Sequence, residues 1–239
     1  MNPRVSKKQS VKRVALGVGL GFALLVGVVW LLIAGLGNTA PGLYAGKQLT
    51  YWQAQLYGHD TRGSNEAFKV VKSQVIPQLL DRMFHDTNDS RLRVFLVETL
   101  DGLPGVQIYF TQADTRRMNA AQSIGELGPV AQSAVPSLLQ ALRGKDAAVR
   151  GAVIEALGKI HSEPQVVIPL LIGYLEDESL NDGAALALAN YGSLAKAAVP
   201  KIIPMLHAPD KDARFAATKA LRQIDPEAYQ SATNSEQGR

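Results

Sequence analysis

The segment "SAVPSLLQAL", Ser133 to Leu142, places a proline where an apolar helical pattern begins. The apolar residues Val135, Leu138, Leu139 and Leu142 have the spacing of one face of an α-helix. Proline is tolerated in the first turn of a helix because a backbone N–H there has no partner within the helix. The segment therefore predicts a helix that starts at about Val135.

This arrangement recurs along the chain. Copies begin at Val135, Ile168 and Val199, which are 33 and 31 residues apart, and proline follows at once in each copy as Pro136, Pro169 and Pro200. An earlier copy begins at Ile76 and is followed by Pro77. A fixed period of this length indicates a repeat protein.

An alanine-rich segment precedes each of the later copies. In "AAVRGAVIEALGKI", Ala147 to Ile160, the apolar residues again follow a helical period, and similar stripes recur over residues 180–191 and 213–224. Gly128 and Gly192 mark the expected ends of such helices. Each unit is thus a pair of antiparallel helices. Because one pair cannot bury both apolar faces, stacked pairs are expected to form an all-α, curved α-solenoid.

The N-terminal part of the chain predicts a membrane anchor. Residues 14–36 form a run of 23 residues without a charge, about 34 Å long as a helix, which is enough to cross a bilayer. The alternative is a cleavable signal peptide, but the run is longer than a signal core. The cations of the basic segment 1–13 predict a cytoplasmic N-terminus, with the repeats outside the cytoplasm, in the periplasm or at the cell surface.

The remaining boundaries follow from composition. Residues 37–64 are expected to form a linker and a leader helix, residues 65–228 the solenoid, and residues 229–239 a disordered tail. Within the predicted anchor, Gly17 and Gly21 form a G-x-x-x-G pair that would permit helix dimerisation.

Charge and residue usage argue against several function classes. The formal net charge is +4, but the first 13 residues alone contribute +5, so the rest of the chain sums to −1 and predicts no nucleic-acid partner. The chain has no cysteine, and none of its four histidines lies four residues from another. We therefore expect no metal site, no cofactor and no catalytic residue, and a protein that is not an enzyme.

The repeats also carry a family resemblance. The segment "AAQSIGELGPVAQSAVPSLLQALRGKDAAVRGAVIEALGKI", residues 120–160, resembles the short HEAT repeats of bacteria in its Ala-Leu-Gly-x-Ile, Val-Pro-x-Leu-Leu and Asp-x-x-Val-Arg elements. The segment "YAGKQLTYWQAQL", residues 44–56, is similar to a leader segment of membrane-anchored bacterial proteins of this type.

The resemblance implies a membrane-tethered scaffold that binds a protein or another macromolecule through its solenoid surface. It further implies that the proline-initiated helices line the concave side. The exposed positions on these helices are the candidate partner-binding residues: Gln140, Arg143, Tyr174, Lys201 and His207. Two alternatives stay open. Bilin lyases use repeats that resemble these, and a solenoid would also serve as a structural spacer in the cell envelope.

Overall fold

We describe the protein from a computed structural model, in which residues 44, 46–58, 61–86, 89, 94–95 and 111–237 are placed well enough to describe. The chain divides into two units. Gly42–Asp89 and Thr111–Arg239 form one unit, and Met1–Pro41 and Ser90–Phe110 belong to the other. The following account concerns the first unit.

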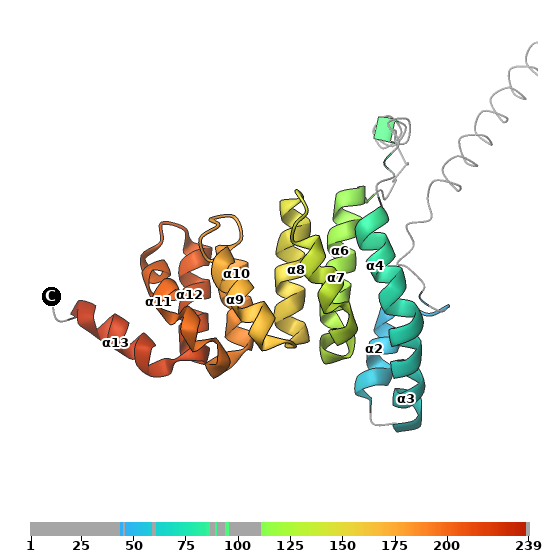
Figure 1. The fold of residues 1–239 in the computed structure, drawn as a ribbon, viewed down its shortest axis with the longest axis horizontal. Coiled ribbons are helices and arrows are strands. Elements are labelled where there is room, and N and C mark those ends of the chain that lie inside the picture. Colours follow the sequence, from blue (N-terminus) through green and yellow to red (C-terminus); the bar gives the residue numbers. More distant parts are fainter. Residues whose placement is uncertain are drawn as a thin grey trace, which may run out of the picture. The chain divides into compact units, whose positions relative to one another are not determined.

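The described part of this unit consists mainly of helices joined by short turns (Figure 1). Its α-helices are α2 (Leu49–Tyr57), α3 (Thr61–Val70), α4 (Ile76–His85), α6 (Ala113–Glu126), α7 (Val135–Ala141), α8 (Ala147–Ile160), α9 (Pro164–Tyr174), α10 (Asn181–Asn190), α11 (Val199–Ile202), α12 (Lys211–Ile224) and α13 (Pro226–Gln237). The π-turn η1 (Val71–Val75) joins α3 to α4. Three 3₁₀ segments complete the list: η2 (Gly128–Ala134), η3 (Gly192–Ala198) and η4 (Ile203–His207).

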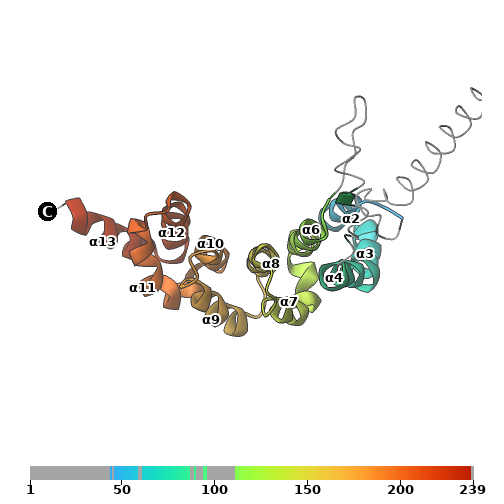
Figure 2. The same cartoon turned by 90° about the horizontal axis from the view of Figure 1, so that it is seen from above.

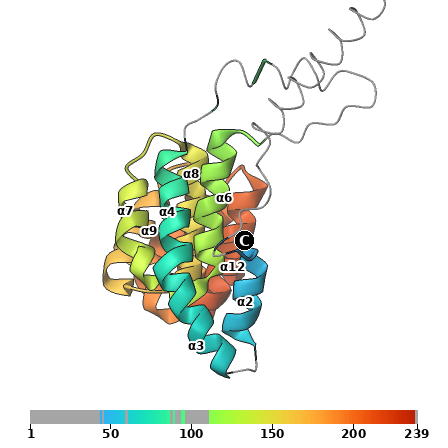
Figure 3. The ribbon, with the colours of Figure 1, turned by 90° about the vertical axis from the view of Figure 1, so that its right-hand side faces the viewer.

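The helices lie in two rows (Figures 2 and 3). The alanine-rich helices α6, α8, α10 and α12 form one row, and α4, α7, α9 and α11 form the other. Consecutive members of the first row pack directly against one another. This arrangement agrees with the predicted α-solenoid. Within this unit the first row lies on the inner side of the bend in Figure 2, so we call it the inner row and the second the outer row.

The placement of the rows corrects one expectation. The proline-initiated helices α7, α9 and α11 lie in the outer row, on the convex side, where the sequence predicted the concave side. The physical reason is residue size. The small side chains of the alanine-rich helices let their axes approach closely, and a row with closer spacing takes the inside of a bend.

Glycine permits this close approach inside the inner row. A Cβ atom on Gly125 would lie 2.6 Å from the Cα atom of Ala156, and one on Gly158 would lie 2.7 Å from the Cα atom of Ala187. Real Cβ atoms do not approach backbone atoms so closely. The two glycines therefore set the spacing from α6 to α8 and from α8 to α10.

The four prolines of the recurring pattern occupy three kinds of position in the helices. Pro136 and Pro200 lie in the first turn of α7 and α11, as predicted. Pro169 instead lies inside α9, which begins five residues earlier at Pro164. Pro77 lies in a helix that continues from α3 through η1, where the N–H of Ile76 bonds to the carbonyl of Val71. The π-turn thus accommodates a proline that an unbroken α-helix would resist.

Carboxylates cap several helices of this unit, among them α6, α8 and α12. Asp146 accepts hydrogen bonds from the N–H groups of Ala148 and Val149 at the start of α8, and Asp210 does the same for Ala213 in α12. The hydrogen bond from the Ala213 N–H holds the pKa of Asp210 below its usual value. Helix α6 takes its cap from a distant segment, because the N–H of Ala113 donates to Asp89 at 2.6 Å.

Two predictions concern the ends of the chain. The predicted anchor over residues 14–36 lies outside the described residues, and none of the helices among the residues that are described has the length and hydrophobicity to cross a membrane. Where the sequence predicted a disordered tail over residues 229–239, the chain stays helical in α13 as far as Gln237.

Candidate functional site

A groove of about 590 Å³ lies on the inner row, where α6, α8 and α10 end. We call it the inner groove. It is lined by residues of α2, α6, η2, α8 and α10: Gln53, Gly125, Glu126, Gly128, Gly158, Lys159, His161 and Asn190. Helix α2 contributes because Tyr57 donates a hydrogen bond to the carbonyl of Leu127 at 2.9 Å, across 70 residues of sequence.

The groove exists because glycines line it. Gly125 and Gly158 are required for helix packing, as shown above, and they leave no side chains there. Gly128 takes the left-handed conformation that ends α6, with φ of +55°, and a Cβ atom at this position would lie 2.9 Å from the hydroxyl of Tyr57. The packing requirements of the solenoid thus produce a hollow with polar residues at its edges.

His161 is the unusual residue of the inner groove. It ends α8 in the left-handed conformation, with φ of 52°, at the position that Gly128 and Gly192 occupy at the ends of α6 and α10. A side chain with a Cβ atom pays a conformational penalty of about 1 kcal/mol there. The repeat therefore keeps an imidazole at a position where glycine would be less strained.

Tyr191 supports this imidazole. Its ring lies 4.8 Å from that of His161, between centroids, with the planes tilted by 50°. The Tyr191 hydroxyl donates to the carbonyls of Leu157 and Ser162, at 3.2 and 2.9 Å. Burial of the phenol raises the pKa of Tyr191 to about 12, so the hydroxyl stays protonated and able to donate at neutral pH. The loop after α8 is thereby fixed, and His161 with it.

The charged groups of the inner groove are largely balanced. Lys159 pairs with Glu155 at 2.7 Å, one turn earlier on α8. Glu126 accepts a weak hydrogen bond from the amide of Gln53 at 3.4 Å. Asn190 adds a second exposed amide. The groove thus offers hydrogen-bond donors and acceptors with little net charge, which suits the polar backbone and side chains of a polypeptide.

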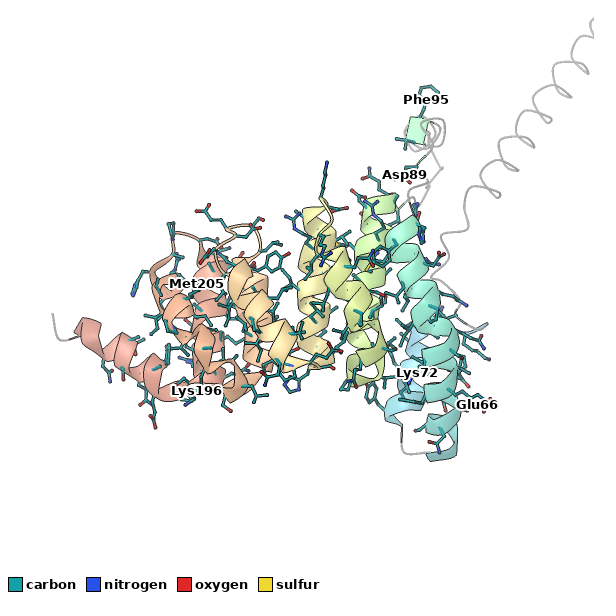
Figure 4. All side chains as sticks on the ribbon, viewed as in Figure 1. Glu66, Lys72, Asp89, Phe95, Lys196 and Met205 are labelled. Carbon is teal, nitrogen blue, oxygen red and sulfur yellow. The ribbon has the colours of Figure 1, made fainter. Side chains whose placement is uncertain are left out.

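A second groove, of about 350 Å³, lies between α3, η1, η2, α7 and the start of α9. It is lined by Phe68, Lys72, Pro129, Val130, Gln132, Ser133, Pro136 and Glu163. Lys72, labelled in Figure 4, lies on η1 with its ammonium group 5.9 Å from the centre of the Phe68 ring. This groove is smaller and less polar, and its prolines restrict the backbone around it.

The five residues predicted to bind a partner lie on or beside the outer row. Gln140 and Arg143 are exposed at the end of α7, Lys201 is exposed on α11, and His207 is exposed at the end of η4. Tyr174 ends α9 and donates to the carbonyl of Leu142 at 3.3 Å, while Lys201 pairs with Glu176 at 2.6 Å. None of the five lines either groove described here.

The sequence contains a signal for the inner groove that none of the predicted site residues reflects. His161 stands one repeat after Gly128 and one before Gly192, so an alignment of the repeats shows a histidine where glycine is expected. The contribution of Gln53 carried no such signal, since only the folded chain brings α2 against η2.

No chemical centre stands out in the part of the chain that the structure describes. Over those residues, histidine, aspartate and glutamate side chains do not gather in groups of three or more that could hold a metal ion. Apart from tyrosine and tryptophan, the same residues include no buried residue with a polar or charged side chain.

The structure is similar to a solved complex, that of CpcE and CpcF of phycocyanin lyase from a Nostoc species, with a TM-score of 0.50 and 21% sequence identity. The match covers 81% of this chain and 70% of that chain. A search of curated protein sequences gave no match.

This similarity corrects one expectation. The sequence predicted that the protein is not an enzyme, and this prediction is wrong as an inference from the scaffold, because a similar solenoid is part of a lyase. The absence of a recognisable catalytic motif on a helical repeat does not exclude an enzymatic role, since catalysis or assistance to it requires only a shaped surface and suitable side chains.

The sequence profile of HEAT repeats matches residues 111–189. The matched region runs from the start of α6 to the end of α10 and includes most of the inner groove. Helix α4 before it, and α11 and α12 after it, continue the same two rows (Figure 2). Residues 111–189 therefore match HEAT repeats, and the described helices around them have the two-row arrangement of a repeat solenoid.

Proposed function

We propose that the protein is a scaffold that binds a polypeptide partner in the inner groove. The observation that carries the proposal is His161, which keeps a strained backbone at a position where the neighbouring repeats have glycine. Such strain is retained where a side chain serves a function. The imidazole faces a groove whose remaining polar groups suit hydrogen bonding to a peptide.

We also propose, from the sequence, that residues 14–36 anchor the scaffold in a membrane with the repeats outside the cytoplasm. The N-terminal segment carries the cations expected on the cytoplasmic side. Carbonate extraction of native membranes tests the anchor, and digestion by added protease tests the orientation. Release of the protein by carbonate, or protection of the repeats in cells with a permeabilised envelope, would contradict the proposal.

A lyase-like role is a second candidate. Its support is the fold that the chain shares with the phycocyanin lyase complex. The sequence identity of 21% is too low to transfer the roles of individual residues. If the chain handles a tetrapyrrole, the protein purified from its native source should absorb visible light. A colourless preparation that also fails to take up added bilin would remove this candidate and leave the scaffold proposal intact.

Site-specific photocrosslinking in native membranes tests the scaffold proposal. A photoreactive phenylalanine analogue replaces Lys159 in the inner groove or, as the matched variant, Lys201 in the outer row. Both lysines are exposed and each pairs with a single glutamate, so the two replacements cost similar interactions. We expect a discrete adduct from position 159 and a weak or absent one from position 201.

The reverse result would assign binding to the outer row, where the five residues predicted from sequence lie. Adducts at neither position would contradict a scaffold that binds through either row. In both cases the assignment is checked by placing the photoreactive analogue at Gln53 or at Gln140. Gln53 lies in the inner groove and Gln140 on the outer row.

A further inference from the structure

Among the described helices, α12 is the last of the inner row, and its face away from α10 differs in composition from the corresponding face of α8. On α8 the face that meets the next helix carries Gly151, Ile154 and Gly158, which contact Leu180, Gly183 and Ala187 of the following segment. The corresponding positions of α12 are 64 residues later: Phe215, Thr218 and Arg222. The two glycines that admit the neighbouring helix in α8 are thus replaced by phenylalanine and arginine in α12.

These residues form a cationic stripe with an aromatic centre. Lys211, Phe215, Thr218, Lys219 and Arg222 follow the spacing i, i+4, i+7, i+8, i+11 and lie on one side of α12. We call this stripe the α12 patch. Phe215 is 65% exposed, and the two lysines and Arg222 are exposed around it. The patch is about 16 Å long.

The charge of the patch is unbalanced. Asp212 is the single acidic residue of α12 and stands against four cations on the same helix. Among the residues that the structure describes, no carboxylate lies within ion-pair distance of Lys211 or Lys219. The exposed cations of the patch therefore attract a negatively charged partner, because the described part of the protein does not neutralise them.

Arg222 is held in place by helix α13. Its guanidinium group lies 4.8 Å from the centre of the Tyr229 ring and donates a hydrogen bond to the Tyr229 hydroxyl at 3.1 Å. A guanidinium group fixed by an aromatic ring loses less conformational freedom when it binds a carboxylate. The patch thus has one oriented cation, Arg222, beside two lysines that no ion pair with a described residue holds.

We propose that the α12 patch binds an acidic polypeptide segment that carries an apolar side chain. Carboxylates of the segment pair with Lys211, Lys219 and Arg222, and the apolar side chain packs on Phe215. This surface is separate from the inner groove and does not depend on the function proposed for it.

Other occupants fit the patch less well. A further HEAT repeat, or a second copy stacked in the same way, would need the close approach that Arg222 prevents at the position equivalent to Gly158. Two copies meeting patch to patch would bring like charges together. An anionic membrane would gain little, because membrane binding scales with buried apolar area and Phe215 is the one large apolar residue in the patch.

Fluorescence anisotropy with a defined probe tests the proposal. The probe is a labelled peptide of about ten residues, long enough to span the patch, made of glutamates around one central leucine. A peptide with glutamine in place of every glutamate is its neutral control. We expect the full-length protein in detergent to bind the acidic peptide, to bind the neutral one poorly, and to lose affinity as salt is raised.

Variants then locate the binding surface. The double variant Lys211→Glu/Lys219→Glu should weaken binding of the acidic peptide about tenfold, and Phe215→Ala should weaken it several-fold. The matched control is Lys69→Glu/Lys145→Glu, which makes the same change in net charge at two exposed lysines away from the patch. Helical circular dichroism and the melting temperature check that each variant is folded.

Equal binding by the patch variants and the control variant would overturn the proposal, as would failure of the acidic peptide to bind at all. Vesicles of phosphatidylglycerol and a single-stranded oligonucleotide are tested in parallel. If the patch variants lose either of these while keeping the peptide, the patch serves a lipid or a nucleic acid and the proposal is wrong.

Discussion

At the scale of single residues, the loop after α8 contains both non-glycine residues with positive φ that are found in the described part of the chain. His161 and Glu163 have φ values of 52° and 49°. The ring contact between His161 and Tyr191 offsets part of the strain at position 161. Glu163 has no such compensation, because it precedes α9 without a side-chain capping bond. The backbone strain at Glu163 is therefore less compensated than the strain at His161.

The substitution Glu163→Gly should raise stability by about 1 kcal/mol, because glycine adopts the left-handed conformation without a steric penalty. Thermal unfolding measures the effect as a higher melting temperature. Ser162→Gly is the control, since Ser162 has no positive φ and glycine there should cost stability. Equal effects of the two substitutions would show that backbone strain at position 163 is not the cause.

At the scale of helices, spacing within the inner row is set by a few small residues. Gly158 and Gly173 make the contrast clear, although both lie inside helices. A Cβ atom on Gly158 would meet the backbone of α10, whereas nothing lies within 4 Å of the position of a Cβ atom on Gly173. The same residue type is therefore a packing requirement in α8 and an unfavourable helix residue in α9.

The substitution Gly158→Ala should destabilise the protein by about 2 kcal/mol, since it forces α8 and α10 apart. Gly173→Ala should stabilise it by about 0.5 to 1 kcal/mol through helix propensity alone. Urea unfolding followed by helical circular dichroism measures both. Stabilisation by Gly158→Ala would contradict the close approach of the two helices.

At the scale of the whole described unit, stability depends on contacts between neighbouring helix pairs. A solenoid buries its core through these interfaces, so the loss of one central interface separates the repeats on either side of it. Leu157 is fully buried in α8, in the middle of the continuous apolar core. It is therefore a position from which the cooperativity of the stack can be tested.

The substitution Leu157→Asp should destabilise the protein by about 4 kcal/mol or more, because it removes a buried side chain and forces an unpaired carboxylate into the core. We expect a lower melting temperature and a broader transition in calorimetry as the central repeats unfold. The exposed Gln165→Asp, in the first turn of α9, is the control and should change little. An unchanged melting temperature for Leu157→Asp would contradict its place in the core.

The sequence determined the class of fold and much of its repeat structure, because these follow from local periodicity. The apolar stripes, the prolines at positions 136 and 200, and the glycines at 128 and 192 each act within one or two turns of helix. Predictions from local sequence were incomplete where the position of a proline within a helix depended on the preceding segment. Pro169 lies inside a helix that started earlier, and Pro77 is accommodated by a π-turn.

Only the tertiary structure decided which row lies on the inner side and where the candidate sites are. The inner groove joins Gln53 to residues up to Asn190, and the α12 patch is exposed because none of the described helices covers Phe215 and the cations around it. The inner groove and the α12 patch both depend on how closely helices approach one another. This distance is set by contacts between repeats and not by the sequence of one repeat. Periodicity in a sequence reports which face of a helix is buried, but it does not report how near the next helix can come.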